Sequence, residues 1–124
     1  MFLKLAHTRL DVYKYSRQLA LEVYKITKLF PDEERYTLSS QIRRAALSVH
    51  LNISEGSSRK SENERKRFYE IARGSVIEVD TAIGFAFDLK YVNASQIENL
   101  GSHIINSFKV IAGLINKNRI KTNL

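Results

Sequence analysis

Residues 95–115 read SQIENLGSHIINSFKVIAGLI, and this stretch decides the fold class. Its apolar residues recur in steps of three and four positions, which is the repeat of a helix with one face toward a core. The expected core positions are Ile97, Gly101, Ile104, Phe108, Ile111 and Ile115. Ser95 and Glu98 have the spacing of a capping box, in which each side chain bonds the backbone amide of the other. We therefore predict a helix over residues 95–118.

The same repeat occurs in three earlier stretches, which are separated by short breaks at residues 30–34, 56–58 and 91–93. Their expected core positions are Val12, Ser16, Leu19, Val23, Ile26 and Phe30; then Ile42, Ala46, Val49 and Ile53; then Phe68, Ala72, Ser75, Val79, Ala82, Ala86 and Leu89. We expect Thr8, Thr37 and Ser61 to cap the helix starts with their hydroxyls. Pro31 should end the first helix, and Gly56 should end the second in a left-handed conformation. The predicted helices cover residues 8–30, 37–55 and 61–91.

No segment of the sequence has the period-two alternation of a half-buried strand. Four long helices joined by short loops favour antiparallel neighbours. The sequence therefore predicts an all-α protein, an antiparallel up-down-up-down four-helix bundle. We expect one domain over residues 1–124, in which residues 119–124 form a basic tail.

The apolar runs in this chain are short. None approaches the roughly 20 residues that span a bilayer, and the longest candidate is interrupted by Asn106, Ser107 and Lys109. The first residues, MFLKLAH, are too short and too interrupted for the apolar region of a signal peptide. We expect a cytoplasmic protein that has no membrane partner.

The charge balance is strongly positive. The 124 residues contain 20 Lys and Arg against 13 Asp and Glu, which gives a net charge of +7. Such an excess favours a nucleic acid or an anionic membrane as partner, although composition alone does not choose between them. The excess is concentrated at the two ends of the chain, with +4 on residues 1–30 and +3 on residues 93–124.

Motifs that carry enzymatic chemistry are missing from the sequence. The absence of cysteine excludes a disulfide scaffold, a thiolate nucleophile and a cysteine-bound metal. His7, His50 and His103 are far apart, and no Glu-x-x-His motif of a di-iron bundle accompanies them. Neither a phosphate-binding P-loop nor a nucleophile elbow is present. We expect no enzymatic activity, no cofactor and no metal.

Basic residues gather between the second and third predicted helices and again near the C-terminus. Exposed cations at such places can contact phosphates without reading a base sequence. The candidate nucleic-acid-binding residues are Arg43, Arg59, Lys60, Arg65, Lys66, Arg67, Lys117, Arg119 and Lys121.

The second predicted helix is unusually polar. Arg43 and Arg44 are adjacent, so their side chains diverge by about 100° and only one of them can face a given neighbour. The candidates for an internal polar network are Gln41, Arg44, Asn52, Glu55 and Glu78. Two interpretations stay open for this segment: a network that fixes helix register, or a binding surface that uses Arg43 or Arg44.

Several large apolar residues lie off the predicted core stripes. These are Tyr15, Leu47, Leu51, Phe85 and Phe87. A monomeric bundle would expose several of them, and a contiguous apolar patch usually marks an interface. A core stripe that is wide enough to cover them is the alternative.

Short motifs spread over most of the chain resemble one known family. They are LDVY at residues 10–13, FP at 30–31 followed by Glu34, TLSSQIRRAA at 37–46, NISEG at 52–56, ARGS at 72–75 followed by Glu78, and the turn at 89–92. This set resembles the four-helix-bundle proteins of the 23S rRNA intervening-sequence family. The resemblance extends from about Leu10 to Ile115, and the combination of QIRRAA with NISEG is its most specific part.

The resemblance implies an antiparallel four-helix bundle that assembles into a ring-like homo-oligomer, typically a pentamer. The family is named for genes that lie inside intervening sequences of 23S rRNA genes. A similar bundle is the accessory protein of diversity-generating retroelements, where a basic surface is thought to contact nucleic acid and a reverse transcriptase. No catalytic residues are established for the family.

These observations favour a non-enzymatic accessory protein that forms homo-oligomers and binds RNA or DNA backbones. By resemblance, a reverse transcriptase is a further partner. The alternative is a protein-interaction scaffold that does not bind nucleic acid.

Overall fold

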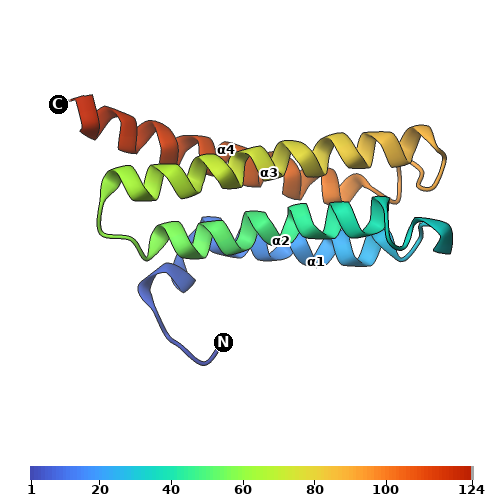
Figure 1. Cartoon of the computed structure of the whole chain (residues 1–124), viewed down its shortest axis with the longest axis horizontal. Coiled ribbons are helices and arrows are strands. Elements are labelled where there is room, and N and C mark those ends of the chain that lie inside the picture. Colours follow the sequence, from blue (N-terminus) through green and yellow to red (C-terminus); the bar gives the residue numbers. More distant parts are fainter. Residues whose placement is uncertain (124) are drawn as a thin grey trace.

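The computed structural model describes the backbone of residues 1–123 and the side chains of residues 1–117. Its four α-helices are α1 (Asp11–Thr27), α2 (Leu38–Ser57), α3 (Glu62–Asp88) and α4 (Glu98–Asn123). Short 3-10 turns, η1 (Ala6–Arg9) and η2 (Asp32–Glu34), precede α1 and α2. Residues 1–123 contain no strand, and successive helices run in alternating directions (Figure 1). The all-α four-helix bundle predicted from the sequence is confirmed.

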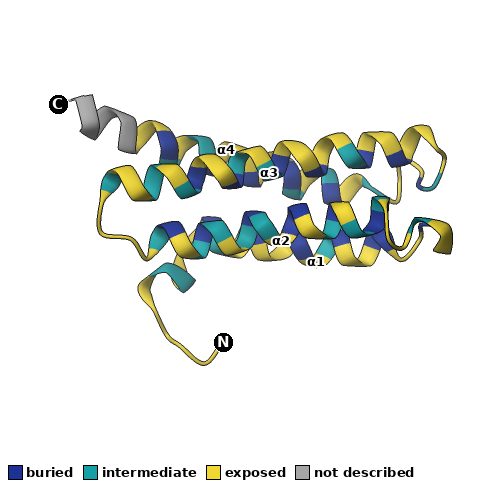
Figure 2. Ribbon diagram, in the orientation of Figure 1, coloured by how far each residue is buried: buried dark blue, intermediate teal, exposed yellow. Residues whose placement is uncertain are grey.

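Each helix packs against two others around one core. Helix α1 contacts α2 and α4, and α3 contacts the same two helices, so α1 and α3 lie across the bundle from each other. The buried residues of the four helices face inward, and exposed residues cover the outside (Figure 2). As a result, the outer surfaces of α1 and α3 point in opposite directions.

The predicted core positions of the first two helices are confirmed. All six positions from Val12 to Phe30 are buried, and Ile42, Ala46, Val49 and Ile53 are completely buried. Their regular three- and four-residue spacing puts them on one face of each helix.

The predicted core positions of the other two helices are partly wrong. In α3, Ala72, Val79 and Ala86 are buried as expected, but Tyr69, Val76 and Ile83 take the places predicted for Phe68, Ser75 and Ala82, and Leu89 is exposed. In α4, Ile104, Ile111 and Ile115 are buried, whereas Phe108 is 39% exposed and the small Ser107 beside it is fully buried. Leu100 is fully buried in place of Gly101, which is half-buried.

Two of the three predicted helix caps lack the expected hydroxyl bond. The Thr8 hydroxyl donates to the carbonyl of Leu5 at 2.7 Å within η1, and α1 begins only at Asp11. Thr37 occupies the N-cap position of α2 as predicted, but its side chain makes no capping bond, and its hydroxyl donates to Glu34 Oε1 at 2.9 Å. Ser61 is the exception, because its hydroxyl accepts the amide of Glu64 at 3.4 Å as a capping box requires.

Gly56 does not end its helix. Helix α2 continues to Ser57, and no glycine within residues 1–123 has a positive φ. The glycine instead lies where α2 meets α3. A Cβ atom at this position would lie 2.8 Å from Phe68 Cβ and 3.0 Å from the Tyr69 ring.

The connection between α3 and α4 also differs from the prediction. Helix α3 ends at Asp88, and Lys90 has a positive φ of 65°. At the start of α4 the reciprocal bonds join Asn93 and Gln96, each 2.9 Å long, in place of the pair predicted at Ser95 and Glu98. The described part of the chain contains no helix that is long and apolar enough to cross a membrane.

Candidate functional site

The predicted cations between α2 and α3 are largely bound to their own loop. Arg59 forms an ion pair with Glu55, and its guanidinium lies 5.2 Å from the centre of the Phe68 ring. Arg65 donates to the backbone carbonyls of Arg59, at 3.1 Å, and Lys60, at 2.6 Å. These contacts close the loop and lower the number of cations that are free for a ligand.

The other predicted cations have few partners. Lys66 lies 3.9 Å from Glu70, one helical turn further along α3. Lys60, Arg67 and Lys117 are exposed, and their ammonium or guanidinium groups have no ion-pair partner within residues 1–117. The side chains of Arg119 and Lys121, and the basic tail predicted at residues 119–124, lie outside the part of the chain whose side chains the structure describes.

Arg43 binds the neighbouring helix. Its Nε donates to Thr27 Oγ1 at 2.7 Å and its Nη2 to the carbonyl of Tyr24 at 3.4 Å. The guanidinium also lies 4.7 Å from the centre of the Tyr24 ring. Tyr24 is in the last turn of α1, where backbone carbonyls lack helical partners. Arg43 therefore ties α2 to the end of α1 and is the less available of the two adjacent arginines for an external ligand.

Arg44 is the arginine that points outward. It is exposed and lines a surface hollow with Tyr36, Ser40 and Leu47. This arrangement reverses the two roles that the sequence analysis gave to Arg43 and Arg44.

The predicted polar residues do not form one network. Gln41 Nε2 lies 3.5 Å from Glu78 Oε1, which joins α2 to α3 at the surface. Asn52 donates to the carbonyl and the hydroxyl of Ser48, at 2.8 and 3.1 Å. Ser75 in turn donates to the Ser48 hydroxyl at 2.9 Å. The resulting chain from Asn52 through Ser48 to Ser75 fixes α2 against α3 without Arg44 or Glu55.

A row of cations on α1 is the site that the sequence analysis missed. Lys14, Arg17, Lys25 and Lys28 are all exposed, and Leu21, 56% exposed, stands at the middle of the row. Each lies two positions from a buried residue of α1, and a step of two positions turns about 200° around a helix. These five residues form the basic stripe, on the face of α1 opposite the core.

No residue of the basic stripe forms an ion pair within residues 1–117. The two ion pairs found within residues 1–117 belong to α2 and α3, and neither involves a residue of the stripe. The sequence signal was the spacing of 3, 4, 4 and 3 residues from Lys14 to Lys28, since steps of three and four residues keep side chains on one face of a helix.

Two histidines join the start of the chain to the bundle. His7 Nε2 lies 3.0 Å from the Ser54 hydroxyl, and His50 Nδ1 lies 2.8 Å from the Ser16 hydroxyl. The Tyr13 ring contacts both imidazoles, with centroid distances of 5.8 Å to His7 and 4.6 Å to His50. Burial, and secondly the nearby charge of Arg17, lower the pKa of His50 below its usual value of 6.5. These histidines hold α1, α2 and η1 together.

The apolar residues predicted to lie off the core are mostly exposed. Leu47 and Leu51, one turn apart on α2, are 39% and 62% exposed, and Phe85 and Phe87 on α3 are 56% and 45% exposed. Tyr15 is half-buried. Leu47 and Leu51 share one face of α2, whereas Phe85 and Phe87 are two positions apart and therefore about 200° apart around α3.

A shallow apolar groove of about 350 Å³ runs between α3 and α4. It is lined by Val76, Ile77, Asp80, Ile104, Ile105, Phe108 and Lys109. Ile77 and Ile105 are more than half exposed, and Asp80 and Lys109 supply one charge of each sign. The described residues contain no group of three or more His, Asp or Glu side chains that could hold a metal ion.

Comparison with models of known protein families matches residues 8–113 to the 23S rRNA-intervening sequence protein. The chain belongs to this family. The match covers α1 to α3 and most of α4, so the resemblance drawn from short motifs is confirmed.

The fold has a solved counterpart. It is a protein of unknown function from the S23 ribosomal protein family of Bacteroides thetaiotaomicron, with a TM-score of 0.77 and 21% sequence identity. The alignment covers 84% of this chain and 97% of the other. At this identity the likeness concerns the fold alone. The comparison with curated proteins gave no match.

Proposed function

We propose that this chain is a non-enzymatic, nucleic-acid-binding member of the 23S rRNA-intervening sequence family that acts as a ring-like homo-oligomer. The basic stripe of α1 supports the proposal most directly. It presents four cations on one face of one helix, and none of them is neutralised by an ion pair within residues 1–117.

The dimensions of the basic stripe suit a phosphate backbone. From Lys14 to Lys28 the helix rises about 21 Å, since each residue adds 1.5 Å. Phosphates along one strand of a duplex are about 3.4 Å apart, so several of them fit within this length. Lys and Arg on a helix face contact phosphates irrespective of the bases. We therefore expect binding that depends on salt and little on sequence.

Self-association is the second part of the proposal. The groove between α3 and α4 carries exposed Ile77, Ile105 and Phe108, and it lies away from α1 because α1 and α3 are across the bundle from each other. A second copy that covers the groove leaves the basic stripe open. Every added copy brings four more stripe cations, and binding at several linked sites strengthens attachment to one nucleic acid.

The proposal is tested by the salt dependence of RNA binding. Fluorescence anisotropy with a labelled 12-nucleotide single-stranded RNA is measured between about 50 and 300 mM salt. For four phosphate contacts we expect the logarithm of the binding constant to fall with the logarithm of salt at a slope of about −2.8. Removing two stripe charges with Lys25→Gln and Lys28→Gln should bring the slope to about −1.4.

The matched control removes two charges from the loop between α2 and α3, with Lys60→Gln and Arg67→Gln. We expect this variant to keep a slope close to that of the wild type. If the salt slope became equally shallow in both variants, the effect would be one of net charge, and the basic stripe would be overturned as the site. Absence of binding by the wild-type chain at 50 mM salt would overturn the nucleic-acid function.

A protein-interaction scaffold is the alternative function, and the exposed Leu47 and Leu51 of α2 favour it. Apolar side chains on adjacent turns suit the apolar face of a partner helix. In that case a purified complex with a partner protein survives nuclease treatment and high salt, and the wild-type chain does not bind RNA at low salt.

A further inference from the structure

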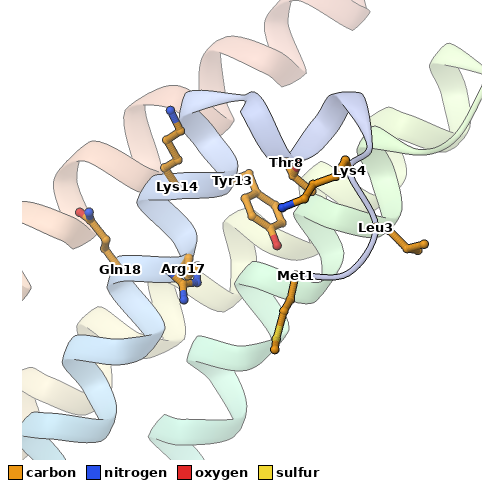
Figure 3. A pocket seen from close by; sticks show the side chains of 8 residues that line it. All are labelled: Met1, Leu3, Lys4, Thr8, Tyr13, Lys14, Arg17 and Gln18. Atoms are coloured by element: carbon orange, nitrogen blue, oxygen red, sulfur yellow. The ribbon is translucent and has the colours of Figure 1, made fainter.

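A second feature near the basic stripe is a hollow between α1 and the first residues of the chain. Residues 1–5, called the N-terminal arm below, curve round Tyr13 in Figure 3. The hollow encloses about 490 Å³ and is lined by Met1, Leu3, Lys4, Thr8, Tyr13, Lys14, Arg17 and Gln18. Sites for small organic ligands usually have volumes of 300–1,000 Å³. We call this hollow the arm pocket.

The charges that line the arm pocket have one sign. Lys4, Lys14 and Arg17 line it without any carboxylate, and none of the three forms an ion pair within residues 1–117. Figure 3 shows the side chain of Lys4 extending from the arm back toward α1. The charge of Arg17 on α1 also acts on α2, where it helps to lower the pKa of His50. The lining charge of the pocket is therefore positive, which favours an anionic ligand over a cationic one.

The rest of the lining is not suited to a bare inorganic anion. Met1 is 91% exposed and Leu3 is 68% exposed, so the N-terminal arm does not bury its apolar side chains against its own bundle. Tyr13 adds an aromatic ring, and Gln18 adds an amide that can both donate and accept hydrogen bonds. Apolar and aromatic surfaces beside cations match a ligand that joins a phosphate to a planar base.

We propose that the arm pocket binds a nucleotide that carries a phosphomonoester, either at the phosphorylated end of a nucleic-acid strand or as a free mononucleotide. A phosphomonoester carries a charge of about −1.5 to −2 at pH 7, compared with −1 for each phosphodiester inside a strand. Three cations without a carboxylate favour the more highly charged group. The strand-end form rests on the proposed function, and it gives that function a preference for phosphorylated ends.

The inference is tested with two single-stranded RNAs of 12 nucleotides that differ only in a 5′-phosphate or a 5′-hydroxyl. Both carry a label at the 3′ end, and their affinities are measured by anisotropy at one salt concentration. We expect the phosphorylated RNA to bind about tenfold more tightly, which is the gain from one charge-assisted contact. Unlabelled AMP should occupy the pocket and remove the advantage of the phosphorylated RNA, whereas adenosine should leave that advantage unchanged. Competition by AMP without any end preference in RNA would assign the pocket to free mononucleotides.

Two variants separate the arm pocket from the rest of the stripe. Arg17→Gln should abolish the difference between the two RNAs. Lys28→Gln, on the same stripe but outside the pocket, should weaken both RNAs equally and keep their ratio. Lys4 lies on the N-terminal arm, outside every helix. If the Arg17→Gln variant folds poorly, Lys4→Gln provides the same test.

The titration of His50 gives a readout that does not depend on RNA. A phosphate beside Arg17 offsets the charge that disfavours the imidazolium, so AMP should raise the pKa of His50 in NMR titrations. Equal affinity for both RNAs together with an unchanged His50 titration in AMP would overturn the arm pocket and leave the basic stripe intact. Failure of both RNAs to bind would overturn the proposed function, and the AMP titration then decides the pocket by itself.

Discussion

Gly56 lies at a point of close packing between α2 and α3. A Cβ here would approach Phe68 Cβ to 2.8 Å, which a rigid helix pair cannot accommodate without moving. Gly56→Ala gains roughly 1 kcal/mol of helix propensity but adds an overpacking cost of about 1–3 kcal/mol. We expect a net loss of up to about 2 kcal/mol in the free energy of unfolding, measured by urea denaturation.

Gly74 is the matched control for Gly56. It is exposed within α3, and a Cβ there meets nothing within 4 Å. Gly74→Ala should therefore stabilise the protein by about 0.5–1 kcal/mol, because only the helix propensity changes. If both alanine variants gained stability, the close approach of α2 and α3 at Gly56 would be contradicted.

His50 makes stability depend on pH. Burial and the charge of Arg17 lower its pKa in the folded state below the ordinary value of 6.5. The unfolded chain therefore binds more protons than the folded chain as pH falls below about 6.5, so stability rises with pH through that window and is fully present above it. We expect His50→Gln to flatten the dependence of the urea midpoint on pH between 5 and 7.

At the scale of the helices, the C-terminal end of α3 is held in an unfavourable backbone conformation. The amide of Tyr91 bonds the carbonyl of Ala86 and that of Lys90 bonds Phe87, both at 3.0 Å. These are the two bonds of a Schellman motif, whose left-handed position usually belongs to glycine. Here Lys90 occupies it, at a φ of 65°.

Replacing Lys90 with glycine should therefore stabilise the protein. A side chain in the left-handed region costs about 1–2 kcal/mol, and the greater freedom of glycine in the unfolded chain returns part of that gain. We expect Lys90→Gly to raise the free energy of unfolding by about 1 kcal/mol in urea denaturation. The same exchange inside a helix, Lys25→Gly, should lower it by about the same amount. If both Lys90→Gly and Lys25→Gly lowered the free energy of unfolding, the proposed backbone strain at Lys90 would be contradicted.

Periodicity predicted the four helices, but their exact ends depend on contacts that periodicity does not describe. The hydroxyls of Thr8 and Thr37 donate to nearby groups in the turns before α1 and α2, and neither makes a capping bond to its helix. In α3, apolar or small residues occur in adjacent pairs such as Ser75 and Val76, which are about 100° apart. The position of the neighbouring helices decides which member of each pair is buried.

The same reason explains why the candidate site was only partly predicted. Arg43 contacts α1 and Arg44 faces outward because α1 lies on the Arg43 side of α2. On which side α1 packs depends on the handedness of the bundle, which the hydrophobic repeat does not specify. The cations around Arg59 form a conspicuous run in the sequence, but the folded loop binds Arg59 and Arg65 itself. The basic stripe is spread over α1, so only its helical spacing reveals it.

At the scale of the whole molecule, apolar surfaces lie on two different parts of the bundle. Leu47 and Leu51 are exposed on α2, and the groove with Ile105 and Phe108 lies between α3 and α4. Helices α2 and α4 are across the bundle from each other. Closed rings need heterologous contacts, in which one surface of a copy meets a different surface of the next. For the proposed ring, we infer that the α2 surface of one copy covers the α3–α4 groove of its neighbour.

A mixing experiment tests this arrangement of copies. Leu51→Asp and Phe108→Asp each place a charge on one of the two surfaces, so each variant alone should lose the ring mass and sediment as a monomer in analytical ultracentrifugation. In an equimolar mixture, the Phe108→Asp variant keeps an intact α2 surface and the Leu51→Asp variant keeps an intact groove. These two surfaces can pair, but the resulting dimer has no further intact pair of surfaces. We therefore expect the mixture to form dimers. If the contact were isologous, it would use only one of the two surfaces. The variant charged on the unused surface would then stay fully assembled, and mixing the two variants would create no new species. Ile71→Asp, on an exposed position of α3 outside both surfaces, is the control and should keep the wild-type mass.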